Sequence, residues 1–298
     1  MAFLIDADTR IVVQGLTGAT GRLGAEMMQA GGAKIVAGVT PGKRGELVDG
    51  IPVFDTVDEA VEAGGTASIL FVPAALLRDA ALEAIEAGMD PIVLMVDGVP
   101  LDVSLELVAA AEHRGVTLIG PNSPGVISPG RSLLGALRAE FYSPGTIALI
   151  SRSGGMMTTI AYQLTLAGLG QSTCVGVGGD AVIGLDVSAA ALLAQNDPET
   201  DRLLIFGEVG TGQEERLAQL VRDGAITKPV YAYIAGAAAP AGKRYSHAGA
   251  SADEHGGGAE RKRSILRDAG ITVLDRYIDA RGIGHVASIE RGTRRHAW

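Results

Sequence analysis

The strongest constraint on the fold is an alternation of short, continuously apolar runs with amphipathic stretches. Runs that are apolar without alternation are typical of strands buried on both faces, and intervening helices provide the crossovers of a parallel sheet. The first half of the chain predicts strands at Arg10–Gly15, Lys34–Val39, Ala67–Pro73, Pro91–Val96 and Val116–Gly120. The pattern predicts an α/β protein whose first sheet is parallel and covered by helices on both sides.

A second series of the same kind follows a break in the pattern. Residues 121–146 contain four prolines and little periodicity, which is typical of a connection. Further strands are predicted at Thr146–Ser151, Ser172–Gly178, Arg202–Gly207 and Pro229–Gly236, and helices at Met156–Ala167, Glu214–Asp223 and Glu260–Ala269. We therefore expect one domain at residues 1–121, a crossover linker at 122–145 and a second domain at 146–298.

Composition and charge exclude several classes of protein. Hydrophobic residues make up 47% and charged residues 20% of the 298 residues, which is a globular composition. The net charge of −9 gives no footprint for nucleic acid. Cys174 is the single cysteine, and no apolar stretch approaches the roughly 20 residues that span a bilayer. We expect a cytoplasmic protein without nucleic-acid or membrane partners, and no histidine spacing predicts a metal site.

The turn after the first predicted strand is rich in glycine. Gly15, Gly18 and Gly21 follow G-x-x-G-x-x-G spacing, which lets backbone N–H groups and a helix start face a phosphate. The spacing differs from the dinucleotide G-x-G-x-x-G, and no ribose-binding acid follows about 20 residues later. Lys43 lies beyond the second strand instead, which favours a phosphorylated ligand over NAD. A tight turn without a ligand remains the alternative.

Two further motifs lie in the second half. Ser151–Gly155, reading SRSGG, ends a strand and begins an apolar helix, so it is either an anion site or a simple helix cap. His247, in KRYSHAG, follows a predicted strand and lies off any apolar face. A neutral imidazole there is an available nucleophile, although a loop histidine is more often an ordinary surface residue.

Glu208 ends a predicted parallel strand, at the edge where α/β sheets place functional groups. Its carboxylate there is able to accept a hydrogen bond from one histidine ring nitrogen and so raise the basicity of the other. The alternative is an acid that caps the next helix.

Together these motifs resemble the α subunit of succinate–CoA ligase over about residues 4–280. The likeness rests on the runs QGLTG, AGVTPGK, PNSPGVISPG, GQSTCVGVGGD, GEVG, TKPVYAYIAG and HAG. It implies an N-terminal Rossmann-like domain that binds coenzyme A and a flavodoxin-like ligase domain. It also implies a separate ATP-grasp β subunit that binds ATP or GTP with Mg²⁺, which agrees with the lack of a Walker-type sequence in this chain.

The resemblance also implies roles for individual residues. His247 corresponds to the histidine that is phosphorylated, and Glu208 to the acid that supports it. The phosphate would be held by Ser153, Gly154 and Gly155, and the acid substrate would lie near Thr158. Coenzyme A would contact Thr17, Gly18, Ala19, Thr20, Lys43, Met95, Val96 and Asp97.

Some positions depart from the family pattern. Thr158 and Thr159 replace a Tyr-Glu pair, Ser123 replaces a cysteine, and Val96-Asp97-Gly98 replaces Thr-Glu-Gly. SRSGGM and the residues after HAG are locally closer to the ligase portion of ATP-citrate lyase and citryl-CoA synthetase. We therefore expect a small di- or tricarboxylic acid, with malate or citrate as alternatives to succinate. A non-catalytic CoA-binding protein and an NAD-dependent oxidoreductase are the competing functions.

Overall fold

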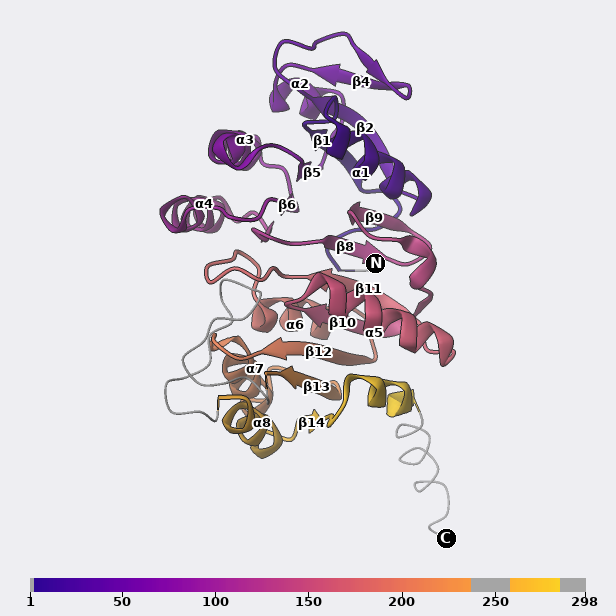
Figure 1. Cartoon of the computed structure of the whole chain (residues 1–298), viewed down its shortest axis with the longest axis vertical. Coiled ribbons are helices and arrows are strands. Elements are labelled where there is room, and N and C mark those ends of the chain that lie inside the picture. Colours follow the sequence, from indigo (N-terminus) through magenta and orange to yellow (C-terminus); the bar gives the residue numbers. More distant parts are fainter. Residues whose placement is uncertain (1–2, 237–257, 285–298) are drawn as a thin grey trace.

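A computed structural model describes residues 3–236 and 258–284 of the chain. Two seven-stranded sheets lie one above the other, each with helices on its faces (Figure 1). Within the described residues, no helix is both long and apolar enough to cross a membrane.

The first sheet has the strand order β3-β4-β2-β1-β5-β6-β7. Its strands are β1 (Arg10–Gln14), β2 (Lys34–Val39), β3 (Leu47–Val48), β4 (Ile51–Phe54), β5 (Ala67–Leu70), β6 (Ile92–Leu94) and β7 (Leu118–Ile119). Its helices are α1 (Ala19–Ala30), α2 (Val57–Glu62), α3 (Ala74–Glu86) and α4 (Leu101–Arg114). Only β3 is antiparallel to its neighbour. The six parallel strands have the order of a Rossmann fold, which confirms the expectation for the first half.

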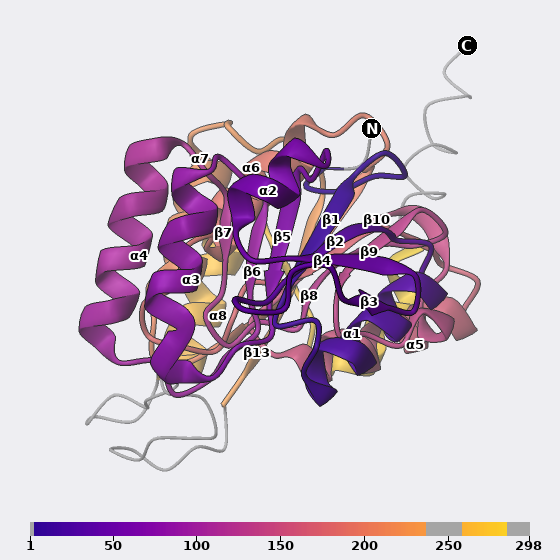
Figure 2. The ribbon, with the colours of Figure 1, turned by 90° about the horizontal axis from the view of Figure 1, so that it is seen from above.

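The two faces of this sheet are covered differently. Helices α3 and α4 pack side by side on one face (Figure 2), where Leu77, Ile85 and Leu107 are buried. Helix α1 lies on the other face and contacts β9 (Ser132–Gly135) of the second sheet. Residues from both halves of the chain, Met28 of α1 and Leu133 of the second sheet among them, belong to one continuous hydrophobic core. The two halves of the chain therefore share a packed interface.

The second sheet has the strand order β14-β13-β12-β10-β11-β8-β9. Its strands are β8 (Gly125–Ser128), β9 (Ser132–Gly135), β10 (Pro144–Ser151), β11 (Gln171–Gly176), β12 (Arg202–Glu208), β13 (Val230–Ala235) and β14 (Thr272–Val273). Its helices are α5 (Gly154–Leu166), α6 (Val187–Asn196), α7 (Gln213–Arg222) and α8 (Gly258–Asp268), with short η1 (Ala139–Phe141) and η2 (Tyr277–Gly282). The five parallel strands have the flavodoxin-like order, as expected.

The segment expected to be a crossover linker contains the hairpin β8–β9. Strand β8 pairs antiparallel with β11, so the hairpin extends the second sheet on the side that faces α1. Glycines permit this close pairing, since a Cβ atom on Gly125 would lie 2.1 Å from the Leu134 carbonyl oxygen. Prolines are typical of turns and connections, so a sequence pattern rich in proline does not indicate strands as short as β8 and β9.

Candidate functional site

The turn between β1 and α1 is built from closely packed backbone. Gly15 has φ +80°, and its N–H donates to the Val39 carbonyl oxygen at 2.8 Å. A Cβ atom on Gly21 would lie 2.2 Å from the Gly15 carbonyl oxygen, so glycine lets α1 start directly against the turn. The N-cap residue, Gly18, provides no side-chain hydrogen bond. The first N–H groups of α1 are therefore able to bind an anion.

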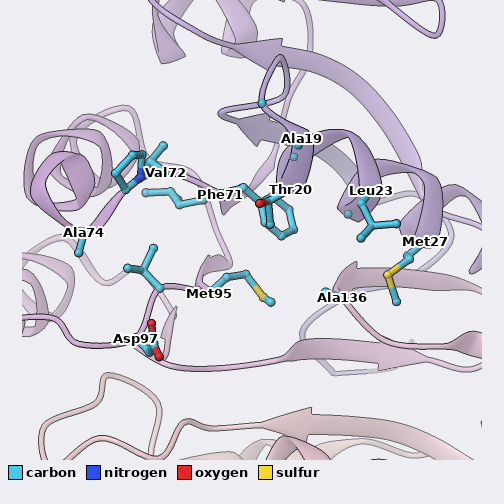
Figure 3. A pocket seen from close by; sticks show the side chains of 16 residues that line it. Ala19, Thr20, Leu23, Met27, Phe71, Val72, Ala74, Met95, Asp97 and Ala136 are labelled. Atoms are coloured by element: carbon cyan, nitrogen blue, oxygen red, sulfur yellow. The ribbon is translucent and has the colours of Figure 1, made fainter.

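A cavity of about 610 Å³ opens beside this helix start (Figure 3). Gly18, Ala19 and Thr20 form one wall, and Met95, Val96 and Asp97 come from the loop after β6. The remaining walls are mainly apolar and are formed by Gly21, Leu23, Gly24, Met27, Leu70, Phe71, Val72, Pro73, Ala74 and Ala136. The cavity lies beyond the carboxyl ends of β1 and β5, where the strand order reverses, which is the usual ligand position in such sheets.

A second cavity of about 420 Å³ lies next to the first. The two cavities share Gly18 and the segment 71–73 as lining residues. The second is bounded by Thr17, by the segment 39–41 at the end of β2 and by residues of α3, including Leu76 and Glu83. An elongated ligand is therefore able to pass over Gly18, with an anionic group at the start of α1.

Lys43 does not line either cavity. The loop that carries it is fixed by Asp55, whose Oδ1 accepts the N–H groups of Gly42, Lys43 and Arg44 at 2.7–3.1 Å. The Lys43 ammonium pairs with Glu46 at 2.8 Å, and both side chains are about half exposed. To bind a ligand phosphate, this ammonium must exchange its carboxylate partner.

The structure thus brings together seven of the eight residues expected to contact coenzyme A, with Lys43 as the exception. Sequence reasoning missed Phe71, Val72 and Pro73, which follow β5 and line both cavities. All three lie in the last part of the strand predicted at Ala67–Pro73, and this position at a strand end was the available signal, since ligands bind at that edge. Ala136, from the segment after β9, carried no signal in the sequence.

The turn between β10 and α5 is held by its own serines. The N–H of Ser153 donates to Ser151 Oγ at 3.1 Å, and that hydroxyl donates to the Ser153 carbonyl oxygen at 2.8 Å. Ser153 Oγ accepts the Met156 N–H as the N-cap of α5. Gly154 and Gly155 begin the helix, and a Cβ atom on Gly155 would meet nothing within 4 Å. The Ser153 side chain thus caps one N–H group of the helix start, and the space beside Gly155 is free of other atoms of the described residues.

Glu208 ends β12, the parallel neighbour of β10. Ser151 is paired with Phe206, so Ser153 and Glu208 lie two residues beyond paired positions at the same edge of the sheet. Arg152 connects the two turns, since its Nη1 donates to Thr211 Oγ1 at 3.2 Å. Glu208 is 9% exposed. The acid and the helix start predicted to hold phosphate therefore follow neighbouring strands at the switch point of the second sheet.

Hydrogen bonds join this edge to the first cavity. The N–H of Asn122 donates to the Val96 carbonyl oxygen at 2.8 Å, and its side-chain amide donates to Asp180 at 3.1 Å. The Asp180 carbonyl oxygen accepts Arg152 Nη2 at 3.3 Å. Because Val96 lines the first cavity, the wall of that cavity is linked to the turn at the start of α5.

Thr158 lies one turn into α5. Its hydroxyl is 2.9 Å from the Tyr142 hydroxyl and donates to the Gly154 carbonyl oxygen at 3.3 Å. Burial raises the pKa of Tyr142 well above its usual range, the nearby Cys174 adds to this rise, and the Thr158 hydrogen bond opposes it. Thr158 and Thr159 place no charge at this part of the helix, where an acidic residue was expected from the family pattern.

His247 lies outside the described residues. The described chain stops at Gly236, just after β13, and resumes at Gly258, where α8 begins. Strand β13 is the parallel neighbour of β12. The chain therefore leaves the described structure next to the edge that carries Glu208.

Two family matches cover most of the described chain. Residues 6–98 match the family described as CoA binding domain, and residues 150–272 match the family described as CoA-ligase. Subunit alpha 2 of succinate–CoA ligase [ADP-forming] from Archaeoglobus fulgidus is 46% identical over 274 residues, which are 92% of this chain and 95% of that protein. The α subunit of malate–CoA ligase from Methylorubrum extorquens is 41% identical over 278 residues, 92% of this chain and 94% of that protein.

A solved structure agrees with the fold. The chain superposes on ATP citrate lyase from Methanothrix soehngenii, solved in complex with citrate and coenzyme A, with a TM-score of 0.88 and 22% identity. The match covers 98% of this chain and 52% of that chain, so this chain spans about half the length of that protein.

Proposed function

The chain belongs to the family of α subunits of ADP-forming succinate–CoA ligases, and we propose that it carries the phosphoryl group of the ligase reaction on His247. Members of this family are acid–thiol ligases that function within a hetero-oligomer. The observation that carries the proposal is the position of Glu208 and the helix start at Ser153–Gly155 at neighbouring strand ends, beside the strand that leads to the His247 segment.

In the proposed reaction, His247 attacks the terminal phosphorus of the nucleotide, a P–N bond forms and the nucleoside diphosphate leaves. A carboxylate oxygen of the acid then takes the phosphoryl group, which breaks the P–N bond and gives an acyl phosphate. The thiol sulfur of coenzyme A attacks the acyl carbon, phosphate leaves, and the thiol proton passes to phosphate or solvent. Each step mainly needs positioning and charge stabilisation.

The described residues would meet these needs in the following way. Glu208 would accept a hydrogen bond from one ring nitrogen of His247, which keeps the other nitrogen free to attack. The α5 N-terminus, at Gly154 and Gly155, would hold the phosphoryl oxygens through backbone N–H groups. Coenzyme A would occupy the two adjoining cavities, with its pyrophosphate near the start of α1 and its thiol toward Asn122 and the second sheet.

The nucleotide would bind to a partner. We propose an ATP-grasp β subunit that holds ATP or GTP with Mg²⁺, in a cytoplasmic complex. The cation would neutralise charge on the nucleotide phosphates during the first transfer. The family name implies a second subunit, and this chain has no Walker-type sequence of its own.

The acid would be a small di- or tricarboxylate. Succinate follows from the family, while malate or citrate is favoured by the neutral Thr158 and Thr159 on α5. The relatives of this chain include a 46% identical α subunit named for succinate–CoA ligase and a 41% identical one named for malate–CoA ligase, so similar α subunits carry the names of different acids.

Reconstitution with the β subunit tests the proposal. The complex should form a CoA thioester and a nucleoside diphosphate in equal amounts, and neither subunit alone should do so. Thermal shift with coenzyme A and with NAD separates the competing functions, because an oxidoreductase would be stabilised by NAD. Stabilisation by coenzyme A without thioester formation by the complex would favour a non-catalytic CoA-binding protein.

A further inference from the structure

Glu208 is held through its own backbone by a buried ion pair. Its N–H donates to Glu214 Oε1 at 3.1 Å, and its carbonyl oxygen accepts a hydrogen bond from Lys262 Nζ at 2.8 Å. Lys262 and Glu214 pair with each other at 2.5 Å. Both backbone groups of Glu208 are therefore fixed by two side chains that contact one another.

The ammonium of Lys262 is fully used in these contacts. It also donates to the Thr211 carbonyl oxygen at 2.5 Å, so its three protons reach Glu208, Thr211 and Glu214. A second carboxylate, that of Glu215, lies 3.5 Å from it. The Lys262 side chain is 4% exposed and that of Glu214 is 0% exposed. These contacts reach from Glu208, at the end of β12, to Thr211 in the turn before α7.

The strand itself makes room for this pair. Gly207 is the single glycine of strand β12. A Cβ atom there would lie 2.5 Å from Glu214 Oε1 and 2.8 Å from Glu214 Cγ. Glycine at this buried strand position therefore lets the carboxylate pass beneath the strand, although glycine weakens a strand interior.

The ion pair of Lys262 and Glu214 is not expected to stabilise the fold more than apolar side chains of similar size would. Replacing a buried ion pair by apolar residues of similar size is often neutral or stabilising, while removal of one partner is strongly destabilising. The contacts here converge on one residue that is proposed to act in phosphoryl transfer. That convergence favours a role in geometry.

We propose that Lys262 and Glu214 are positioning residues for phosphoryl transfer, which fix the backbone of Glu208 and so aim its carboxylate. The inference rests on the proposed role of Glu208. Replacement of Lys262 and Glu214 should leave the affinity for coenzyme A unchanged, because the cavities proposed to bind it lie at the other sheet.

The test is the rate of phosphoryl transfer from ATP to this chain in the complex with its β subunit. The double variant Lys262→Met/Glu214→Leu removes both charges together. Gly207→Ala removes no charge, but its Cβ atom crowds the Glu214 carboxylate and the end of the Ile234 side chain. Each should slow transfer by up to about 100-fold, the loss typical of a misplacement of about 1 Å. Arg267→Met is the control, because Arg267 lies on the same helix and makes an exposed pair with Glu260. It should transfer at the wild-type rate.

A mutant cycle with Glu208→Gln separates positioning from general destabilisation. If the pair acts through Glu208, its replacement should slow transfer by less than about threefold further in the Glu208→Gln background. Independent, multiplying effects would overturn the inference, as would wild-type rates in the double variant and Gly207→Ala. A wild-type rate in Glu208→Gln itself would instead show that the proposed role of Glu208 is wrong.

Discussion

Lys43 provides a quantitative test of the CoA site. Its ammonium is paired with Glu46 at 2.8 Å in an exposed position, where ion pairs contribute about 0.2–1 kcal/mol. A charge-assisted hydrogen bond to a ligand phosphate contributes about 1.5–3 kcal/mol. Binding exchanges the first partner for the second, so Lys43→Ala should weaken coenzyme A binding by about 0.5–3 kcal/mol, or roughly 2- to 100-fold.

The same exchange predicts an opposite effect at the carboxylate. Glu46→Gln releases the ammonium beforehand, so it should strengthen binding by up to about fivefold at low salt and less at high salt. Isothermal titration calorimetry of this chain without its partner measures both changes. Arg44→Ala is the control, because Arg44 pairs with Glu59 instead, and it should change affinity by less than about twofold. Unchanged affinity in Lys43→Ala would refute the assignment.

Three further predictions concern the ligase half. The reconstituted complex should accept malate or citrate at least as well as succinate, because Thr158 and Thr159 place no negative charge at the proposed acid site; a hundredfold preference for succinate in kcat/KM would refute this. Asp186→Ala should lower the free energy of unfolding by about 1 kcal/mol, because Asp186 caps α6. Burial alone would raise the pKa of Asp186, but hydrogen bonds from Ala189, Ser188 and Arg216 hold it below its usual value. This stabilisation is therefore present above the usual Asp pKa of about 3.9 and lost as the pH falls through the lower folded-state pKa. The free energies of unfolding of wild type and Asp186→Ala, measured by chemical denaturation, should therefore become equal in acid.

Patterns within the sequence predicted the elements that repeat regularly. Continuous apolar runs indicated the parallel strands, and the helix predicted at Glu214–Asp223 is found at Gln213–Arg222. The position of the ligand edge was predicted by the same reasoning, since Gly18 follows one predicted strand, Val96 ends another, and both line one cavity. These features depend on local periodicity and on the general rule for parallel sheets.

Contacts between distant segments were not predictable in this way. Lys262 and Glu214 are 48 residues apart, and each looks like an ordinary charged residue on an amphipathic helix. Arg152 is 1% exposed, although nothing in SRSGG indicates a buried guanidinium. The hairpin β8–β9 is defined by its antiparallel pairing with β11, a contact that its own short sequence does not indicate. In each case the tertiary neighbour determines the role, and a single sequence does not reveal it.

The central claim is that His247 receives the phosphoryl group. The most direct measurement is peptide mass analysis under neutral conditions after incubation with the β subunit and ATP, because phosphohistidine is labile in acid. The account predicts one acid-labile phosphoryl group on His247, its absence in His247→Asn, and slowing by about 10²–10⁴-fold in Glu208→Gln. A phosphoryl group on another residue, or CoA ligation that survives in His247→Asn, would contradict it.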